Sequence, residues 1–132
     1  MIKALFFDID GTLVSFNTHE IPQSTVNALE QAKRNGVGVY ISTGRPVKLI
    51  NNLHAIEHLI DGYITTNGAY SFIGDKVVSC VDIPLEDART LIRLADEMNF
   101  ATMVVGAKDL TVYHPDEMVD KVFRQLLNVN DL

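Results

Sequence analysis

The chain has 132 residues, 47% of them hydrophobic, and a formal net charge of -6 at pH 7. This length suits one modest domain with enough apolar side chains for a core. The acidic balance and the lack of a long Lys or Arg run argue against a nucleic-acid-binding surface. No apolar run reaches membrane-spanning length, no signal-peptide pattern opens the chain, and a lone cysteine, Cys80, excludes a disulfide framework. We therefore expect a cytoplasmic protein without nucleic-acid or membrane partners.

The first half of the chain alternates apolar runs with helical patterns. Residues 2–7 are apolar apart from Lys3, as is typical of a strand covered on both faces in a parallel sheet. A polar loop follows, and residues 24–35 have helical spacing. A second strand at residues 37–42, a second helix at 46–59 and a third strand at 63–66 are then expected. This order predicts a parallel α/β unit, in which ligands collect at the carboxyl ends of the strands.

The pattern changes after residue 69. Residues 70–73 and 77–81 flank Gly74-Asp75 and predict a β-hairpin. The remaining expected elements are a helix opened by Pro84, strands at residues 101–105 and 110–114, and a helix opened by Pro115. We place a domain boundary between residues 81 and 82.

The most informative feature is a pair of carboxylates that ends the first predicted strand, in Asp8-Ile9-Asp10-Gly11-Thr12. Side chains alternate along a strand, so Asp8 and Asp10 are expected to point the same way and Ile9 toward the core. Two such carboxylates can flank one phosphorus atom, one attacking it while the other handles the proton of the departing oxygen. Adjacent carboxylates repel, so the pair also implies a divalent cation, and Mg²⁺ is the natural candidate.

Phosphoryl transfer has two alternatives for this segment, a calcium loop and a solvated acidic turn. A calcium loop starting at Asp8 would need glycine at its sixth position and glutamate at its twelfth, which are Leu13 and His19 here. The calcium loop is therefore excluded. A solvated acidic turn after a buried strand stays open, although it does not require this spacing together with Gly11-Thr12.

A second polar cluster follows the second predicted strand. Thr43 offers a hydroxyl donor, Gly44 lets the backbone approach a phosphate, and a helix opened by Pro46 would direct free N–H groups at the same point. Arg45 can contact phosphate or pair with an acid of the site. A Ser or Thr before a helix is often only a cap. Beside the carboxylate pair on a neighbouring strand, however, the cluster predicts an anion cradle.

Asp8-Ile9-Asp10-Gly11-Thr12 and Thr43-Gly44-Arg45 together resemble the first two motifs of the haloacid dehalogenase (HAD) superfamily. Ile64-Thr65-Thr66-Asn67-Gly68-Ala69 strengthens the match and resembles the Cof-type sugar-phosphate phosphatases. The resemblance covers the chain from Lys3 onward. It implies an α/β fold with a Rossmann-like parallel-sheet core, whose first half would be residues 1–81. Residues 82–132 would then begin an inserted α/β cap.

The resemblance also implies roles for individual residues. Asp8 would be the nucleophile that forms an aspartyl-phosphate and binds Mg²⁺. Asp10 would be the general acid and then the base, with its backbone carbonyl on the same ion. The implied phosphate- or substrate-binding residues are Thr43, Gly44, Arg45, Gly11 and Asn67. Asn67 is equally well explained as a turn residue of an Asn-Gly pair. The implied substrate is a small phosphorylated metabolite, such as a sugar phosphate.

The family also uses a lysine beside the nucleophile and a late acidic motif, and neither has a matching context in this sequence. The candidates for the lysine are Lys48, Lys76, Lys108 and Lys121, and the candidates for the acidic motif are Gly74-Asp75 and Asp131. The simplest interpretation is a chain that ends inside the cap and has little or no activity alone. A half sheet would leave an unpaired edge and an uncovered apolar face, so self-association is expected.

Two other functions stay open. The first is a catalytically silent α/β module that binds phosphate or a partner. The second is a receiver-type phosphoacceptor domain, which also uses an aspartate and Mg²⁺. The receiver interpretation leaves the hairpin and the second α/β segment unexplained.

Overall fold

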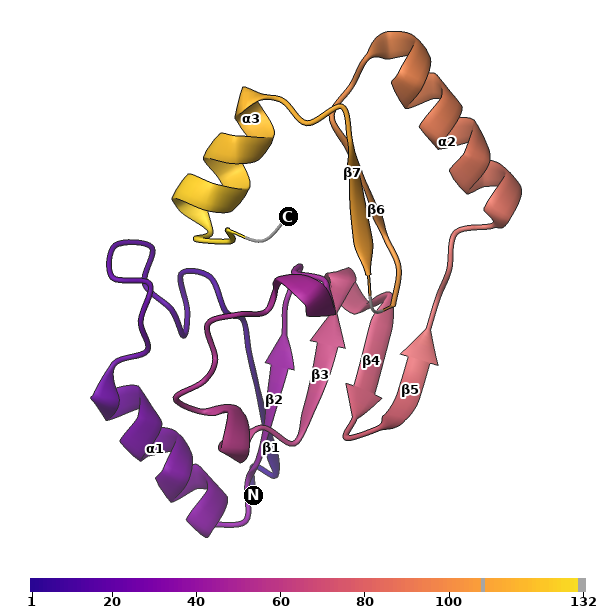
Figure 1. The fold of residues 1–132 in the computed structure, drawn as a ribbon. Helices are drawn as coiled ribbons and strands as arrows, with labels where there is room; N and C mark the ends of the chain where they lie inside the picture. Colours follow the sequence, from indigo (N-terminus) through magenta and orange to yellow (C-terminus); the bar gives the residue numbers. More distant parts are fainter. Residues whose placement is uncertain (108, 131–132) are drawn as a thin grey trace. The chain divides into compact units, whose positions relative to one another are not determined.

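The structure is a computed structural model that describes residues 1–107 and 109–130 (Figure 1). The chain divides into two compact units, Met1–Cys80 and Val81–Leu132. No helix in the described part of the chain is both long enough and apolar enough to cross a membrane.

The first unit is built on a five-stranded sheet. Its strands lie in the order β1 (Ala4–Phe7), β2 (Gly38–Ser42), β3 (Gly62–Thr65), β4 (Tyr70–Ile73) and β5 (Lys76–Cys80). The first three strands are parallel, so their carboxyl ends meet at the same edge of the sheet. The last two strands are antiparallel, and the predicted hairpin therefore extends the same sheet. Each of these strands lies within two residues of its predicted position.

One face of the sheet carries the core. The helix α1 (Gln23–Arg34) buries Val26 and Leu29, which lie three residues apart on its apolar face. These side chains belong to the same buried cluster as Val39 and Ile41 of β2, both 0% exposed. The amphipathic helix predicted for this segment is confirmed.

The predicted helix over residues 46–59 is wrong. The segment holds two single-turn 3₁₀ helices, Val47–Leu49 and Glu57–Leu59. In a continuous α-helix the Leu49 carbonyl would accept the N–H of residue 53, but here it accepts a hydrogen bond of 2.7 Å from the Arg45 guanidinium. The apolar spacing of the segment still has meaning, because Leu53 and Ile56 are buried in the core.

The opposite face of the sheet is apolar and largely uncovered. Phe6 of β1 is 58% exposed and stacks on Tyr40 of β2, with ring centroids 5.0 Å apart. Ile73 of β4 is also exposed. The expectation that residues 2–7 are covered on both faces is wrong, because α1 and the 3₁₀ segments pack on the face of Val39 and Ile41. The uncovered face expected of a half sheet is present.

An ion pair joins α1 to the loop before β3. Lys33 Nζ lies 2.5 and 2.6 Å from the two carboxylate oxygens of Asp61, and the Val39 N–H donates to the same carboxylate at 2.8 Å. Burial alone would raise the pKa of Asp61. The Lys33 hydrogen bond, the Val39 N–H and the Lys33 charge outweigh burial and hold the pKa below its ordinary value of 3.8.

The second unit contains α2 (Leu85–Met98) and an antiparallel pair, β6 (Thr102–Val105) and β7 (Leu110–Tyr113). The helix α3 (Glu117–Val119) follows and continues as a π-helical segment, Asp120–Leu126. Asp116 caps this helix, since its carboxylate accepts the N–H groups of residues 118 and 119, both at 3.0 Å. The elements predicted after residue 82 are all found. Lys108 and Asp131 lie outside the described residues.

Candidate active site

The predicted site residues come from three loops that follow the three parallel strands. Asp8 follows β1, residues 43–45 follow β2, and Asn67 follows β3. Backbone hydrogen bonds hold the second and third loops together. The Arg45 carbonyl accepts the Thr66 N–H at 3.1 Å, and the carbonyl of residue 43 accepts the Asn67 N–H at 3.2 Å. The sheet thus gathers these loops at the edge where an α/β fold places its ligands.

A tight turn after β1 separates the surroundings of the two carboxylates. The Ile9 side chain is fully buried, as predicted, and its carbonyl accepts the N–H groups of residues 12–14 at 2.9–3.3 Å. Asp8 is exposed, whereas the Asp10 side chain is only 20% exposed and is paired with Arg45. The Asp8 carboxylate is therefore accessible to solvent, whereas the Asp10 carboxylate is held in place by Arg45.

Gly11 is required by the geometry of this turn. Its φ of +80° lies in the left-handed region, and a Cβ built there would lie 2.9 Å from the Phe16 ring. A side chain at this position would be strained and would also clash. The contact with phosphate predicted for Gly11 stays a prediction.

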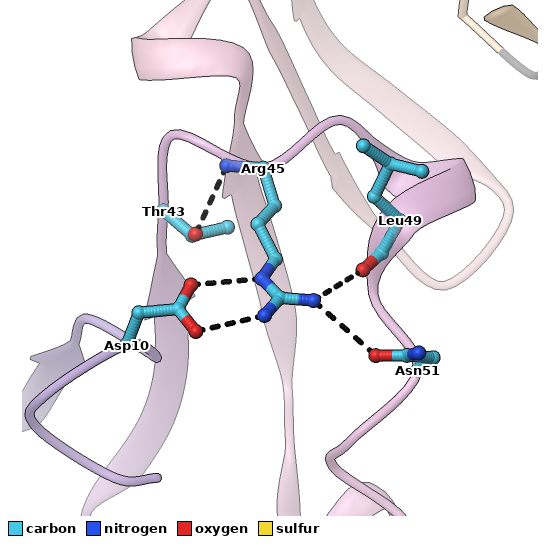
Figure 2. Close-up of polar contacts among 5 residues, drawn as sticks. All are labelled: Asp10, Thr43, Arg45, Leu49 and Asn51. Carbon is cyan, nitrogen blue, oxygen red and sulfur yellow. Dashed lines mark hydrogen bonds and ion pairs between the residues drawn. The ribbon is translucent and has the colours of Figure 1, made fainter. Parts of the chain in front are cut away.

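Arg45 is the centre of the polar network (Figure 2). Its Nε and Nη2 each donate to one oxygen of Asp10 at 2.8 Å, while Nη1 donates to the Leu49 carbonyl at 2.7 Å and to Asn51 Oδ1 at 3.2 Å. The Arg45 side chain is 4% exposed. Of the two roles predicted for Arg45, the structure shows pairing with an acid of the site. Sequence reasoning missed Asn51, because no motif or spacing marks it.

Thr43 begins the loop that carries Arg45. Its Oγ1 accepts the Arg45 N–H at 3.1 Å, and the residue is buried. The hydroxyl therefore serves as a local cap, and its proton remains available to a further acceptor. The helix expected to open at Pro46 is not found, because a single 3₁₀ turn follows Pro46. One turn has few aligned peptide dipoles to direct at an anion. The anion cradle of Thr43 and Gly44 stays a prediction.

The loop after β3 is strained. Thr66, Asn67 and Gly68 have φ values of 51°, 54° and 95°, so three successive residues adopt left-handed conformations. A Cβ built on Gly44 would lie 3.1 Å from Asn67 Oδ1, so the Asn67 side chain would have to shift by a few tenths of an ångström to admit a side chain there. Left-handed non-glycine residues cost about 1–3 kcal/mol each and cluster at functional sites. The exposed Asn67 amide is thus held against the Gly44 backbone.

The exposed carboxylate fits a magnesium site shared with a substrate. Mg²⁺ usually takes one or two carboxylates together with waters and substrate phosphate oxygens. The Asp8 carboxylate and the main-chain carbonyl of Asp10 are oxygen donors of this kind. Among the described residues, no group of three or more His, Cys, Asp or Glu side chains could hold a metal. A closed metal cage made by this part of the chain alone is therefore not found.

The sequence matches the model of a family described as haloacid dehalogenase-like hydrolase over residues 5–131. The chain belongs to this family. The resemblance drawn from the Asp8 and Thr43 motifs is thereby confirmed. The mixed sheet of the first unit is the Rossmann-like core of the HAD fold.

Two solved structures and one sequence relative support the same assignment. BT4131, described as a HAD subclass IIB sugar phosphatase, is 47% identical, with a TM-score of 0.90 over 98% of this chain and 51% of that chain. A structure from work on a trigonal-bipyramidal intermediate in a phosphoryl-transfer superfamily is 46% identical, with a TM-score of 0.94 over 100% of this chain and 51% of that chain. Bacillus subtilis YxeH is 31% identical over 130 residues, which are 86% of this chain and 47% of YxeH. The chain thus spans about half the length of these relatives.

Proposed function

We propose that this chain carries the first half of a Mg²⁺-dependent phosphatase that acts on small phosphorylated metabolites, sugar phosphates in particular. One observation carries the proposal. An exposed Asp8 lies two residues before an Asp10 that is fixed by the buried Arg45, at the carboxyl ends of parallel strands. The sugar-phosphatase description of BT4131, which is 47% identical, supports the substrate class.

In the first step, an oxygen of the Asp8 carboxylate attacks phosphorus, and the bond between phosphorus and the leaving oxygen breaks. Asp10 in its acid form donates a proton to that oxygen. In the second step, the Asp10 carboxylate takes a proton from water, which attacks phosphorus and releases phosphate and free Asp8. Bound Mg²⁺ would neutralise charge on the phosphoryl oxygens.

Arg45 fixes the orientation of Asp10 and leaves its carboxylate able to take part in proton transfer. Both carboxylate oxygens accept hydrogen bonds from the guanidinium, but each oxygen keeps a second lone pair that can hold a proton. The paired contact also fixes the direction of the carboxylate, which keeps its reacting oxygen in place. Arg45 is therefore assigned to Asp10 and not to the substrate.

The loops after β2 and β3 supply the remaining contacts in this proposal. The Thr43 hydroxyl proton and the Gly44 backbone would hold phosphoryl oxygens, and the Gly11 turn would admit them. The exposed Asn67 amide would contact the substrate. The backbone strain at Asn67 and its approach to Gly44 favour this role over that of an ordinary turn residue.

The remaining expectations from the sequence belong to the same proposal. They are a cytoplasmic location, a small metabolite as the only ligand class, self-association through the sheet edge, and residues 82–132 as the start of a cap. We also expect the chain to have little activity alone. The second candidate, a silent module that binds phosphate, is favoured only by the absence of a third metal-binding side chain in the described part of the chain.

The test measures phosphate release from a panel of sugar phosphates with Mg²⁺ and with EDTA. The chain is compared with Asp8→Asn, alone and after co-expression with the second half of BT4131. Activity that needs both halves and Mg²⁺ and is lost in Asp8→Asn is the expected result. Activity retained by Asp8→Asn would disprove the nucleophile. Full turnover by the chain alone would disprove the half-enzyme interpretation.

A further inference from the structure

The guanidinium of Arg45 is held from two sides (Figure 2). Nε and Nη2 form the edge that binds both oxygens of Asp10, each at 2.8 Å. The third nitrogen, Nη1, donates to the Leu49 carbonyl at 2.7 Å and to Asn51 Oδ1 at 3.2 Å. Asp10 and Asn51 therefore lie on opposite sides of one planar group. A contact at Nη1 can influence the Asp10 carboxylate without touching it.

The number of acceptors at Nη1 decides how firmly the guanidinium is oriented. A guanidinium is planar and rigid, so its three nitrogens move as one body. The two protons of Nη1 lie in this plane and point in different directions. With one acceptor, the paired Arg45 and Asp10 side chains can still turn together about that contact. With two acceptors, the Leu49 carbonyl and Asn51 Oδ1, the plane itself is fixed. Asn51 thereby fixes the direction of the edge that holds Asp10.

The segment that carries both acceptors is anchored in the interior of the first unit. Leu49 is 1% exposed and Leu53 is 4% exposed. Between them the backbone is extended at Ile50, with φ −87° and ψ 100°, and the Leu49 carbonyl and the Asn51 side chain reach the same nitrogen. Asn51 is exposed, yet its amide oxygen accepts a hydrogen bond from a side chain that is 4% exposed. The acceptors therefore belong to a part of the chain whose position is fixed by buried leucines.

We propose that Asn51 is a positioning residue for Asp10 and acts through Arg45. Its amide oxygen holds the plane of the guanidinium, and the guanidinium holds the Asp10 carboxylate in the direction needed for proton transfer. This inference rests on the proposed function, in which Asp10 is the acid and then the base. Misplacing a reacting group by about 1 Å can slow a reaction by about 10²-fold. Loss of one of two acceptors should therefore lower kcat by about tenfold.

The kinetic test replaces Asn51 by leucine, which has nearly the same shape and no acceptor. Phosphate release is measured with the second half of BT4131 present. Asn51→Leu should have a kcat about tenfold lower and a KM within about twofold of the unchanged chain, since the substrate is not contacted. Asn51→Asp keeps an acceptor at the same reach and should recover kcat to within about threefold.

The neighbouring asparagine provides a matched control. Asn52 Oδ1 is buried and has no hydrogen-bond partner in the part of the chain that the structure describes. Asn52→Leu makes the same chemical change one residue away and should leave kcat and KM unchanged. Circular dichroism checks that all three variants stay folded.

A second readout uses this chain alone and does not depend on activity. In NMR spectra, the exchange of the Arg45 Nε–H with solvent reports how firmly the guanidinium is held. Asn51→Leu should speed this exchange about tenfold, because one of the contacts that hold the group is lost. Asn51→Asp should restore the slower rate. The ¹³C signal of the Asp10 carboxyl carbon, followed at pH 7, should shift in Asn51→Leu and stay in place in Asn52→Leu.

The two readouts separate this inference from the proposed function. Unchanged Nε–H exchange and an unchanged Asp10 signal in Asn51→Leu would overturn the role of Asn51, whether or not phosphate is released. A raised KM with an unchanged kcat would overturn it too, because Asn51 would then act on the substrate. Absence of phosphate release by the unchanged chain with the second half of BT4131 would count against the proposed function instead.

Discussion

The two acids of the first loop are expected to differ sharply in their effect on stability, although both belong to the proposed chemistry. Asp8→Ala removes an exposed carboxylate and should change the free energy of unfolding by less than about 0.5 kcal/mol. Asp10→Ala removes the partner of Arg45, whose side chain is 4% exposed. The guanidinium then stays buried without its carboxylate.

The expected size of this loss follows from the burial of the pair. Breaking a buried ion pair by removing one partner costs about 3–5 kcal/mol. Asp10 is 20% exposed, so water that enters after its truncation recovers part of that cost. We therefore expect Asp10→Ala to destabilise the first unit by about 2–3 kcal/mol. In a unit of this size, the melting temperature should fall by about 10–20 °C.

Urea unfolding followed by circular dichroism measures both variants. Because the chain divides into two compact units, hydrogen exchange of the β2 amides is used to assign the transition to the first unit. Replacing Arg45 by Met in the Asp10→Ala background should restore at least about 1 kcal/mol, since the unpaired charge is removed. Equal destabilisation by Asp8→Ala and Asp10→Ala, or additive effects in the double variant, would refute the reasoning.

Three further predictions concern other loops. Gly44→Ala places a Cβ 3.1 Å from Asn67 Oδ1, so it should lower the free energy of unfolding by about 1 kcal/mol and slow phosphate release measured with the second half of BT4131 present; unchanged release would contradict a role of these loops in phosphate binding. Asn67→Gly keeps the left-handed backbone and removes the amide, so the KM measured with the second half of BT4131 present should rise with no loss of stability, whereas an unchanged KM would leave Asn67 as a turn residue. Asp61→Asn should cost about 0.5–1 kcal/mol at pH 7, after allowance for solvent screening. Because folding lowers the pKa of Asp61, its stabilisation is full above the unfolded pKa of about 4 and is lost as the pH falls through the folded value. The difference between Asp61→Asn and the unchanged chain in urea unfolding should therefore shrink below pH 4; a constant difference would show that the charge is irrelevant.

The positions of most elements could be predicted because local sequence marks them. The second strand, predicted at residues 37–42, is β2 at Gly38–Ser42, bounded by turn residues on one side and the polar site loop on the other. The helix predicted over residues 46–59 is wrong because of contacts that link this segment to a residue far away in the sequence. Its apolar spacing fits a helix, but Arg45 takes the Leu49 carbonyl while its other nitrogens bind Asp10. No local pattern reports that competition.

In the site, too, some features follow from local sequence and others depend on long-range contacts. The rule that ligands gather at the carboxyl ends of parallel strands predicts that Asp8, Asp10 and residues 43–45 come together. The partner that Arg45 selects depends on side-chain geometry across two loops, and the sequence left two options open. The left-handed conformation of Thr66 could not be predicted, because β-branched residues rarely adopt it. A tertiary hydrogen bond from the Thr66 N–H to the Arg45 carbonyl holds it there.

The charges of the site show what the proposed chemistry needs beyond the residues of the polar network. Among the five residues of Figure 2, the cation is Arg45, and its guanidinium pairs with Asp10. Asp8 and a phosphate monoester together bring about three negative charges, of which a single Mg²⁺ balances two. A further cationic group is therefore required for tight binding of the substrate. The lysine that the family uses beside the nucleophile has no matching context in this sequence, so adding the second half of BT4131 should raise the affinity of the chain for phosphate.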